Sequence, residues 1–560
     1  KEKDSFEGNS NINKELVESV EKKKSKPLFE VNVRIVASAK DNKRAQSIFE
    51  GISSGFSQFS SPQLNGLEAK NISSSGELIH KFSFREFSSS NAMVLNSEEV
   101  ASFFHFPTPF MDIPQIKSLK ARQLSPPPEL PEKGLLLGEN IYKGEREEVR
   151  IKEKDRRRHI YMIGQTGTGK SNLMTDMLHQ DIKNGKGVGV IDPHGDLVED
   201  VLGLIPEDRF DDVILFDPSD INNPLGLNML EFDQSRPEQK TFIVNEMVEI
   251  FDKLYDLQKT GGPMFEQYMR NALLLLMEDF KNEPATLMEV PRVFTDKEFR
   301  QRKLKRISNP TVVNFWKKQA EEAGGEASLE NVTPYITSKF NNFTANEYMR
   351  VIVGQEESSF DFRDVMDKGK IFLVNLSKGK IGDLNANLLG MIVVGKILLA
   401  ALSRVDMPQS KRRDFNLFID EFQNFTTESI STILSEARKY RLSLVMAHQF
   451  VDQLEDDIES AVFGNVGSTI SFRVGAPSAE KIINQFEPDL DENDLVNIDN
   501  YHAYVKLLVN GETVDPFNMK TFEAETPDYS RAEKLKDYVR DKKGMAREEV
   551  EKEIQRRMNN

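Results

Sequence analysis

The sequence predicts an α/β protein with a parallel sheet, an inserted all-α domain and a small N-terminal α+β domain. Short apolar runs alternate with stretches of helical periodicity, the pattern of strands that cross over through helices to form a parallel sheet. The strand pattern stops between residues 239 and 346, where only helical patterns continue. Mixed strand and helix signals over residues 28–115 precede a proline-rich segment. These patterns alone divide the chain into an N-terminal domain, an α/β domain and an all-α insertion.

The composition agrees with a globular chain of several domains. A length of 560 residues with 38% hydrophobic content is enough for two to four domains with sizeable cores. The formal net charge of −16 argues against a surface that coats nucleic acid without specificity, but it leaves room for a local basic channel. The chain contains no cysteine, which excludes a disulfide framework and a cysteine-ligated metal site.

Three segments are expected ahead of the large sheet. Residues 1–27 are charged and polar, and they predict a disordered tail or linker. Residues 28–115 predict the small α+β domain, and residues 116–130 predict a stiff proline-rich linker. Within the small domain we expect strands at residues 29–36, 67–72 and 78–84, and helices at residues 41–56 and from Ser97.

The α/β domain is expected in two parts, residues 131–238 and 347–526, on either side of the all-α insertion at 239–346. A basic run between Arg300 and Arg306 inside the insertion is interpreted as a solvated helix face. Residues 527–560 predict one highly charged C-terminal helix. Strands that lead into the glycine-rich segment are expected at residues 148–151, where the pattern alternates, and 158–163. Buried strands are expected at residues 187–192, 213–218, 371–375, 415–420 and 442–449.

No run of the sequence reaches the roughly 18 uninterrupted apolar residues that span a bilayer. The nearest, residues 388–402, contains Lys396 and predicts a buried helix. No signal peptide is visible, and the chain opens at Lys1 rather than at a methionine, so we expect an upstream segment.

Residues 164–171 match the phosphate-binding loop G-x-x-x-x-G-K-[ST]. Its glycines let successive backbone N–H groups turn inward around an anion, and the next helix adds its positive N-terminal end. Lys170 is expected to reach the β- and γ-phosphates of ATP, and the Ser171 hydroxyl is expected to ligate Mg²⁺. The expected nucleotide-binding residues are Gly164, Gln165, Thr166, Gly167, Thr168, Gly169, Lys170, Ser171 and Asn172.

An acidic pair, Asp420 and Glu421, ends the expected strand at 415–420. We expect Asp420 to hold the Mg²⁺ shell and Glu421 to orient or deprotonate the attacking water, the alternative being an acidic cap for the next helix. Gln449 ends a neighbouring strand, and we expect it to sense the γ-phosphate; it is otherwise a plain polar residue at a strand end.

Hydrolysis at such a site usually needs a cation opposite the developing phosphate charge, often supplied by a neighbouring subunit. Arg438 and Arg473 are the candidates, and ordinary surface pairing is the alternative for both. Asp192 and His194 also follow a strand near the loop, where they either support the metal shell or form a turn.

Four segments together resemble type IV coupling proteins: residues 164–171, 192–197, 417–422 and 438–449. These proteins are the DNA-pumping ATPases of conjugation and type IV secretion, in the ring-forming class that also contains FtsK and HerA. The resemblance covers about residues 130–525 and implies a RecA-like motor with a helical insertion. It also implies an arginine finger at Arg438 and a coupling glutamine at Gln449.

The resemblance further implies partners and a location. It implies a homo-hexamer around a channel for single- or double-stranded DNA, working with relaxosome-like or secretion proteins. It implies a bacterial motor in the cytoplasm, attached to the inner membrane through an upstream segment. Coupling proteins usually begin with transmembrane helices, and none is visible in this sequence.

Three other functions remain open at this stage. One is a HerA-like helicase that processes DNA ends, from which the helical insertion separates coupling proteins. Another is a nucleotide-gated adaptor that recruits substrates without moving DNA, which DNA-stimulated ATP turnover would distinguish. A viral packaging motor is the third.

Overall fold

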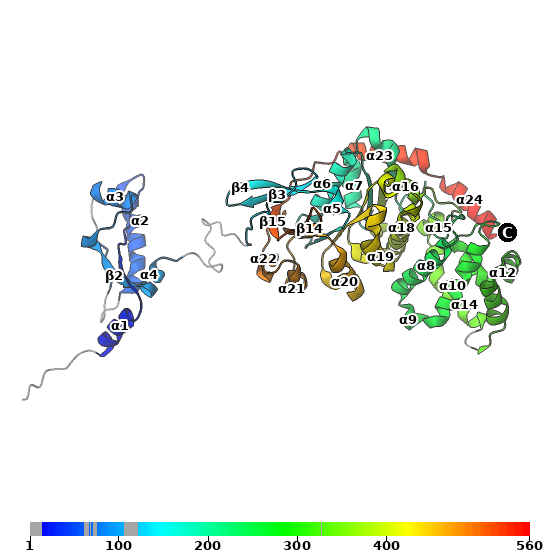
Figure 1. The fold of residues 1–560 in the computed structure, drawn as a ribbon, viewed down its shortest axis with the longest axis horizontal. Helices are drawn as coiled ribbons and strands as arrows, with labels where there is room; N and C mark the ends of the chain where they lie inside the picture. The colour runs from blue at the N-terminus through cyan, green and yellow to red at the C-terminus, as the bar shows by residue number, and fades with distance from the viewer. Residues whose placement is uncertain are drawn as a thin grey trace, which may run out of the picture. The chain divides into compact units, whose positions relative to one another are not determined.

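The computed structural model describes residues 14–60, 66–67, 69–70, 76–105, 121–325 and 328–559 (Figure 1). The chain divides into two compact units, Lys1–Ser118 and Leu119–Asn560. The second unit holds the large sheet and every motif to which the sequence assigns chemistry.

The N-terminal unit consists of short elements and a two-stranded sheet. β1 pairs antiparallel with β2, with Leu28 opposite Asn96. Asn96 also begins α4 through a capping box, because it and Glu99 exchange side-chain and main-chain hydrogen bonds of 2.8 and 2.9 Å. The elements are α1 (Lys14–Lys24), β1 (Leu28–Val31), α2 (Asn42–Gly55), α3 (Gly76–Ser83), β2 (Met93–Asn96) and α4 (Ser97–Phe103).

Several details of this unit differ from the sequence-based expectation. The tail expected over residues 1–27 contains helix α1. The strand expected at 78–84 is wrong, since that segment lies in α3, where Glu77 and Lys81 form an i,i+4 ion pair of 2.7 Å. Periodicity alone does not separate strand from helix in so short an apolar run. Of residues 67–72, those described are not in a strand, and residues 68, 71 and 72 lie outside the described residues.

The second unit is organised around one mixed sheet. Within the described part of the chain the sheet has 11 strands in the order β4-β3-β15-β12-β11-β5-β10-β9-β6-β8-β7. The strands are β3 (Leu135–Tyr142), β4 (Glu145–Ile151), β5 (Ile160–Ile163), β6 (Gly187–Asp192), β7 (Val213–Phe216), β8 (Ile371–Asn375), β9 (Phe415–Ile419), β10 (Leu442–His448), β11 (Ser468–Ser471), β12 (His502–Lys506) and β15 (Phe517–Lys520). From β11 to β7 all neighbours run parallel, as the sequence predicts.

The other side of the sheet is antiparallel, which the sequence analysis did not anticipate. β3, β4, β12 and β15 pair antiparallel, and β12 joins them to β11. Lys143 and Gly144, both at positive φ, turn β3 into β4, as in the tight turns favoured by hairpins. Charged residues along β4 suit an edge strand, because they discourage pairing with other chains.

Helices cover both faces of the sheet and define two hydrophobic cores. On one face α6 (Lys170–Lys183), α7 (Asp196–Leu204) and α23 (Tyr529–Lys543) pack against the strands. On the other face lie α16 (Phe362–Lys368), α18 (Asp383–Ser403), α19 (Glu428–Glu436) and the helical insertion. α20 (Asp456–Asn465), α21 (Ala476–Ile482) and α22 (Glu492–Val496) follow β10.

Helix α18 is the apolar segment predicted as a buried helix. Among the described residues one helix, Asp383–Asp406, is long and apolar enough to cross a membrane by length and composition. However, 72% of its most apolar window is buried inside the protein, where α18 packs against α8 (Gln239–Tyr255) and α16. This burial is typical of the core helix of a globular domain.

The described residues of the insertion form helices joined by short loops and contain no strand. It comprises α8 (Gln239–Tyr255), α9 (Leu257–Thr260), α10 (Gly262–Glu278), α11 (Val290–Thr295), α12 (Lys297–Leu304), α13 (Pro310–Asn314), a π-helix (Phe315–Ala320) and α14 (Leu329–Thr344), before α15 (Glu347–Val353). The single tryptophan, Trp316, is fully buried and donates to the Asn271 carbonyl at 3.2 Å.

The basic run in the insertion is not a solvated helix face, so that interpretation is wrong. Lys303 is fully buried and pairs with the equally buried Asp279 at 3.1 Å. Arg300 is also buried and reaches Glu321 at 3.3 Å. Because the acidic partners Asp279 and Glu321 lie in turns about 20 residues away along the chain, the sequence run alone does not reveal that these charges are neutralised inside the domain.

The C-terminal segment forms two helices rather than one. α23 (Tyr529–Lys543) packs on α7, and α24 (Arg547–Met558) packs on α15. The break follows Lys543, where Gly544 lies so close to Asn223 that an added Cβ would sit 2.7 Å from the asparagine Cβ. The segment therefore spans from the sheet to the end of the insertion (Figure 1).

Candidate nucleotide-binding site

The glycine-rich loop lies between β5 and α6, at the carboxyl edge of the parallel strands. Neighbouring strands fix it, because Gly164 N–H donates to the His448 carbonyl at 3.3 Å and Gln165 N–H to the Arg473 carbonyl at 2.8 Å. Gly167 and Gly169 have φ of 76° and 120°, which side-chain-bearing residues rarely adopt. The loop therefore has the backbone that the motif requires.

Lys170 is buried under the loop rather than extended into solvent. Its ammonium donates to the carbonyls of Gly164 and Gln165, the latter at 3.2 Å. Burial lowers its pKa, while the carboxylates of Asp420 and Glu421 oppose that shift. The charge is thus held where the terminal phosphates of a nucleotide would lie.

The other loop residues divide into two groups. The Thr166 hydroxyl and Ser171 are exposed on the side where a nucleotide would approach. The Thr168 hydroxyl instead donates to the Gln165 carbonyl at 2.7 Å and stiffens the loop. Asn172 turns away, since its side-chain amide bonds Phe522 O at 2.6 Å and Ala524 N at 3.0 Å.

The acidic pair lies directly after β9, beside the loop. Burial raises the pKa of Asp420 to about 7, and the nearby charges of Asp192 and Glu421 raise it further, while Lys170 opposes them. Glu421 is buried and adopts a left-handed backbone with φ of 47°, uncommon for a residue with a side chain. Three carboxylates near one lysine make a place where a divalent cation would relieve repulsion.

A chain of hydrogen bonds joins Glu421 to the loop. Gln449 donates from Nε2 to one oxygen of Glu421 at 2.5 Å, and its Oε1 accepts from the Thr166 hydroxyl at 3.0 Å. The other Glu421 oxygen accepts from Gln423 at 2.7 Å. Both carboxylate oxygens thus accept hydrogen bonds from side-chain amides, and Gln449 links Glu421 to the Thr166 hydroxyl of the loop.

The two residues of the 192–197 segment behave differently. Asp192 is buried and accepts from the main-chain N–H groups of His194 and Val198, at 2.8 and 3.2 Å, so it forms the turn and caps α7. Its charge still acts on Asp420. His194 is exposed. The hydrogen bonds of Asp192 therefore fit the turn interpretation. In addition, the negative charge of Asp192 raises the pKa of Asp420.

The two candidate arginines lie at opposite ends of the parallel strands. Arg473 follows β11 beside the loop, and its guanidinium donates to Asn500 at 2.8 Å and to the Ile498 carbonyl at 3.3 Å. Arg438 precedes β10 and is exposed. The seven residues of β10 separate it from the loop edge by about 20 Å, so it does not reach the nucleotide site of its own chain.

Some neighbours of the site were not anticipated from the sequence. Gln423 orients Glu421, and the only signal was its place two residues later. Tyr501 covers the loop, since its N–H donates to Thr168 O at 2.8 Å and its Cα lies 3.2 Å from where a Cβ on Gly169 would be. Behind the loop the Tyr161 hydroxyl meets His448 Nε2 at 2.5 Å, and burial, helped by the Lys170 charge, lowers the pKa of His448 to about 3.

The donor set fits Mg²⁺ bound with a nucleotide better than a metal held by protein alone. Among the described residues no group of three or more histidine, aspartate or glutamate side chains is arranged to hold a metal ion. Mg²⁺ usually takes one or two protein oxygens and completes its shell with phosphate oxygens and water. Ser171, at the start of α6, and Asp420, directly after β9, are the two residues that would hold such an ion.

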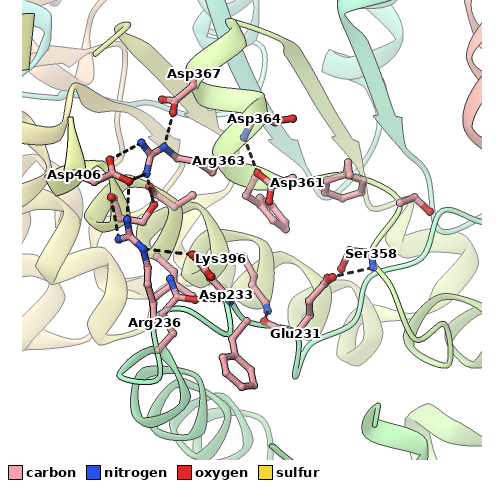
Figure 2. A pocket seen from close by; sticks show the side chains of 18 residues that line it. Glu231, Asp233, Arg236, Ser358, Asp361, Arg363, Asp364, Asp367, Lys396 and Asp406 are labelled. Atoms are coloured by element: carbon pink, nitrogen blue, oxygen red, sulfur yellow. Dashed lines mark hydrogen bonds and ion pairs between the residues drawn. The ribbon is translucent and has the colours of Figure 1, made fainter. Parts of the chain in front are cut away.

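A cavity of about 870 Å³ lies elsewhere, between the start of the insertion, α16 and α18. Figure 2 shows that its charged groups face one another: Arg236 and Arg363 both bind Asp406, and Arg363 also binds Asp367. Because these charged side chains already pair with one another, they are less available to bind a ligand than the polar groups at the glycine-rich loop.

Comparisons with known proteins agree with this geometry. A family model described as the type IV secretion-system coupling protein DNA-binding domain matches residues 146–485. A second model, described as a domain of unknown function (DUF8128), matches residues 5–118. No curated protein matches the chain.

Several solved structures resemble the chain in fold. The plasmid coupling protein TrwB in complex with ADP and Mg²⁺ is 17% identical, with a TM-score of 0.50 over 69% of this chain and 90% of that one. TrwB with a non-hydrolysable ATP analogue is 16% identical, with a TM-score of 0.50 over 68% and 89% of the two chains. VirB4 of Thermoanaerobacter pseudethanolicus is 15% identical, with a TM-score of 0.45 over 72% and 99%.

Proposed function

Because the chain belongs to the family of type IV secretion-system coupling proteins, we propose that it uses ATP hydrolysis to move DNA toward a secretion or conjugation channel. The chain is an ATPase with a RecA-like P-loop domain and a helical insertion, and its cofactors are ATP and Mg²⁺. DNA and components of a secretion system are its classes of partner. The path and strandedness of the DNA belong to the proposal.

The observation that carries the proposal is the hydrogen-bonded chain from Thr166 through Gln449 to Glu421. Lys170 and the loop amides would hold the β- and γ-phosphates, and Ser171 and Asp420 would hold Mg²⁺, which screens phosphate charge when bound. Glu421 would accept a proton from, or orient, the attacking water. Gln449 would register whether the terminal phosphate is present and pass that state to β10.

Assembly completes the proposed site. A lone subunit offers Lys170, Asp420 and Glu421 at one edge of the sheet but has Arg438 at the other edge. A closed ring gives every nucleotide site a neighbour that supplies the missing cation, and we infer a hexamer in which Arg438 acts on the adjacent subunit. Membrane attachment through a further segment of the protein is part of the same proposal.

A path from the nucleotide site to the insertion supports coupled movement. The segment after Glu421 is held by α8: Glu246 accepts from the hydroxyls of Thr427 and Ser429, at 2.9 and 2.5 Å. Lys253 donates to the Thr426 carbonyl at 2.7 Å. A shift of Glu421 would therefore move the helical insertion.

The test is ATP turnover by the full chain, alone and with single- or double-stranded DNA. We expect DNA to raise turnover several-fold in wild type and to leave a Lys170→Ala control inactive. Turnover that does not respond to either DNA, although the protein binds ATP, would favour the substrate-recruiting adaptor and overturn the translocase proposal.

A further inference from the structure

The N-terminal unit buries few of its apolar side chains. Among its described residues Leu95 is the one large hydrophobic side chain that is buried, whereas most exposed large hydrophobic side chains of the chain lie between residues 17 and 104. Exposed apolar surface that gathers in one small unit indicates a site for another molecule. We call residues 28–36 the edge segment; its exposed apolar side chains are Leu28, Phe29, Val33 and Val36.

The edge segment has a strand pattern that a single chain uses only in part. The sequence predicts a strand over residues 29–36, but β1 ends at Val31. Residues 32–36 make no main-chain hydrogen bond to the described part of the chain. One edge of β1 is also unpaired, because β1 and β2 alone form the described sheet of this unit. Free main-chain donors and acceptors along an apolar edge favour pairing with another strand.

The side chains of the edge segment complement one another about its central residue. The sequence from Leu28 to Val36 is Leu-Phe-Glu-Val-Asn-Val-Arg-Ile-Val. When two such segments lie antiparallel with Asn32 opposite Asn32, Glu30 of each lies opposite Arg34 of the other, and the remaining pairs are apolar. Opposite charges and pairs of aromatic or β-branched side chains stabilise neighbouring strands. Moving the centre by one residue either way sets Glu30 and Arg34 against apolar or amide side chains.

Both charges are available for such a contact. Glu30 is exposed and has neither an ion pair nor a hydrogen bond among the described residues. Arg34 donates to the carbonyls of Lys81, at 2.9 Å, and Glu86, but no carboxylate of the described residues pairs with it. Lys and Arg are as numerous as Asp and Glu between residues 1 and 118, so this unit has no formal net charge. Two copies of it therefore do not repel each other, and a nucleic acid is not favoured as its ligand.

We propose that the edge segments of two copies of this chain pair antiparallel, with Glu30 of each copy opposite Arg34 of the other. Residues 32–36 then extend β1, and the two-stranded sheets of both copies join into one sheet of four strands. A sheet of two strands is marginally stable by itself, and pairing also covers its apolar edge. The contact is isologous and joins copies two at a time, so it differs from the head-to-tail contacts of a closed ring.

The test is disulfide cross-linking in the full chain, which contains no cysteine of its own. Leu28→Cys and Val36→Cys each place one thiol at an exposed position. In the proposed register these positions face each other with Cα atoms about 4.5–5.5 Å apart, within the range of a disulfide. Each position lies about 27 Å along the strand from its own equivalent. We expect a cross-linked dimer when the two variants are mixed and oxidised with copper phenanthroline, and at least tenfold less from either variant alone.

Charge reversal tests the register by a second route. Glu30→Arg added to both cysteine variants sets arginines against each other and should slow cross-linking about tenfold. Placing Glu30→Arg with Leu28→Cys, and Arg34→Glu with Val36→Cys, should restore the wild-type rate, because each arginine then faces a glutamate. Glu30→Arg carries this test alone if Arg34→Glu lowers Tm, because Glu30 has no partner among the described residues of its own chain.

The control is Val405→Cys, an exposed position in the second unit. Mixing it with Leu28→Cys should give only the background of random collisions. As much product from this mixture as from Leu28→Cys with Val36→Cys would overturn the proposal, and so would the absence of any product from the latter. Efficient cross-linking of Leu28→Cys to itself would mean parallel strands and would also overturn it. Each of these outcomes leaves the nucleotide site and the proposed ATPase unaffected.

Discussion

The two edges of the parallel sheet differ in how far their polar groups are satisfied. At the carboxyl edge the side chains of Lys170, Glu421 and Gln449 all have hydrogen-bond partners within the chain. At the amino edge of the parallel strands Arg438 has no ion pair among the described residues. A group that is satisfied within its own chain can be organised before a ligand arrives, whereas an unpaired cation is available to a partner. In the proposed ring, each subunit would contribute its carboxyl edge to one nucleotide site and its amino edge to the next.

Substitutions at the two edges should therefore have different effects. A change at the carboxyl edge should damage the subunit that carries it. A change at the amino edge should damage the neighbour's reaction and leave its own nucleotide binding intact.

Lys170→Ala should reduce ATP hydrolysis below detection, because the terminal phosphates lose their only buried cation at the carboxyl edge among the described residues. The carbonyls of Gly164 and Gln165 also lose a donor, which should cost about 1–3 kcal/mol of stability. Turnover, nucleotide affinity and Tm are the measurements. Lys183→Ala, at the exposed end of the same helix, is the control and should retain full activity.

Arg438→Ala should lower kcat by roughly 10³-fold, as expected for an arginine finger, with ATP affinity unchanged because the loop is intact. Mixing Arg438→Ala subunits with Lys170→Ala subunits should restore some turnover, since one type of interface then pairs an intact loop with an intact arginine. Co-assembly is verified by light scattering. If co-assembled mixtures stay inactive, the arginine does not act across the interface and the contrast between the edges fails.

Glu421→Gln should slow hydrolysis by about 10²- to 10⁴-fold while ATP remains bound. In the structure Gln423 and Gln449 each donate to a different oxygen of the Glu421 carboxylate. A glutamine at this position has only one side-chain oxygen, so one of these two hydrogen bonds should weaken or be lost. DNA stimulation of the residual rate should therefore fall as well. Glu428→Gln, at the start of α19, serves as the control. Loss of ATP binding in Glu421→Gln would show a structural role instead.

The smallest effect concerns pH. Asp420 has a folded-state pKa of about 7, above its ordinary value of 3.8, so the folded protein binds a proton more tightly than the unfolded chain. Without ligands, stability should therefore be greatest at low pH for this group and should fall as pH rises between about 4 and 7. Mg²⁺ needs the carboxylate, so Mg²⁺-dependent ATP affinity should weaken about tenfold for each pH unit below 7.

The control for this pH effect is Asp420→Asn, measured by calorimetric titration alongside wild type. It removes the titrating group but leaves protonation of the nucleotide itself unchanged, so the difference between the two profiles belongs to Asp420. Identical profiles would mean that Asp420 does not hold the metal.

Prediction from sequence succeeded where the signal was local. The strand, loop and helix around residues 160–183 follow from a short apolar run, from glycines that permit positive φ and from the helical pattern after them. The buried strands β6, β8, β9 and β10 were recognisable because strands covered on both faces are apolar throughout. It failed for α3, where a short run fitted two periods, and it missed β3, β12 and β15, of which β15 pairs with β3 from far along the chain.

The sequence by itself determined the chemistry: which residues form the phosphate loop, which carboxylates follow β9, and that a glutamine ends β10. These depend on neighbours along the chain, so local pattern suffices. Which residues contact one another became clear only from the tertiary structure. It buried Lys303 against Asp279, joined Gln449 to Glu421, and put Arg438 at the edge that its own nucleotide site does not reach. Burial and charge pairing arise from contacts between distant segments, and the free energy of those contacts is not written in any single stretch of sequence.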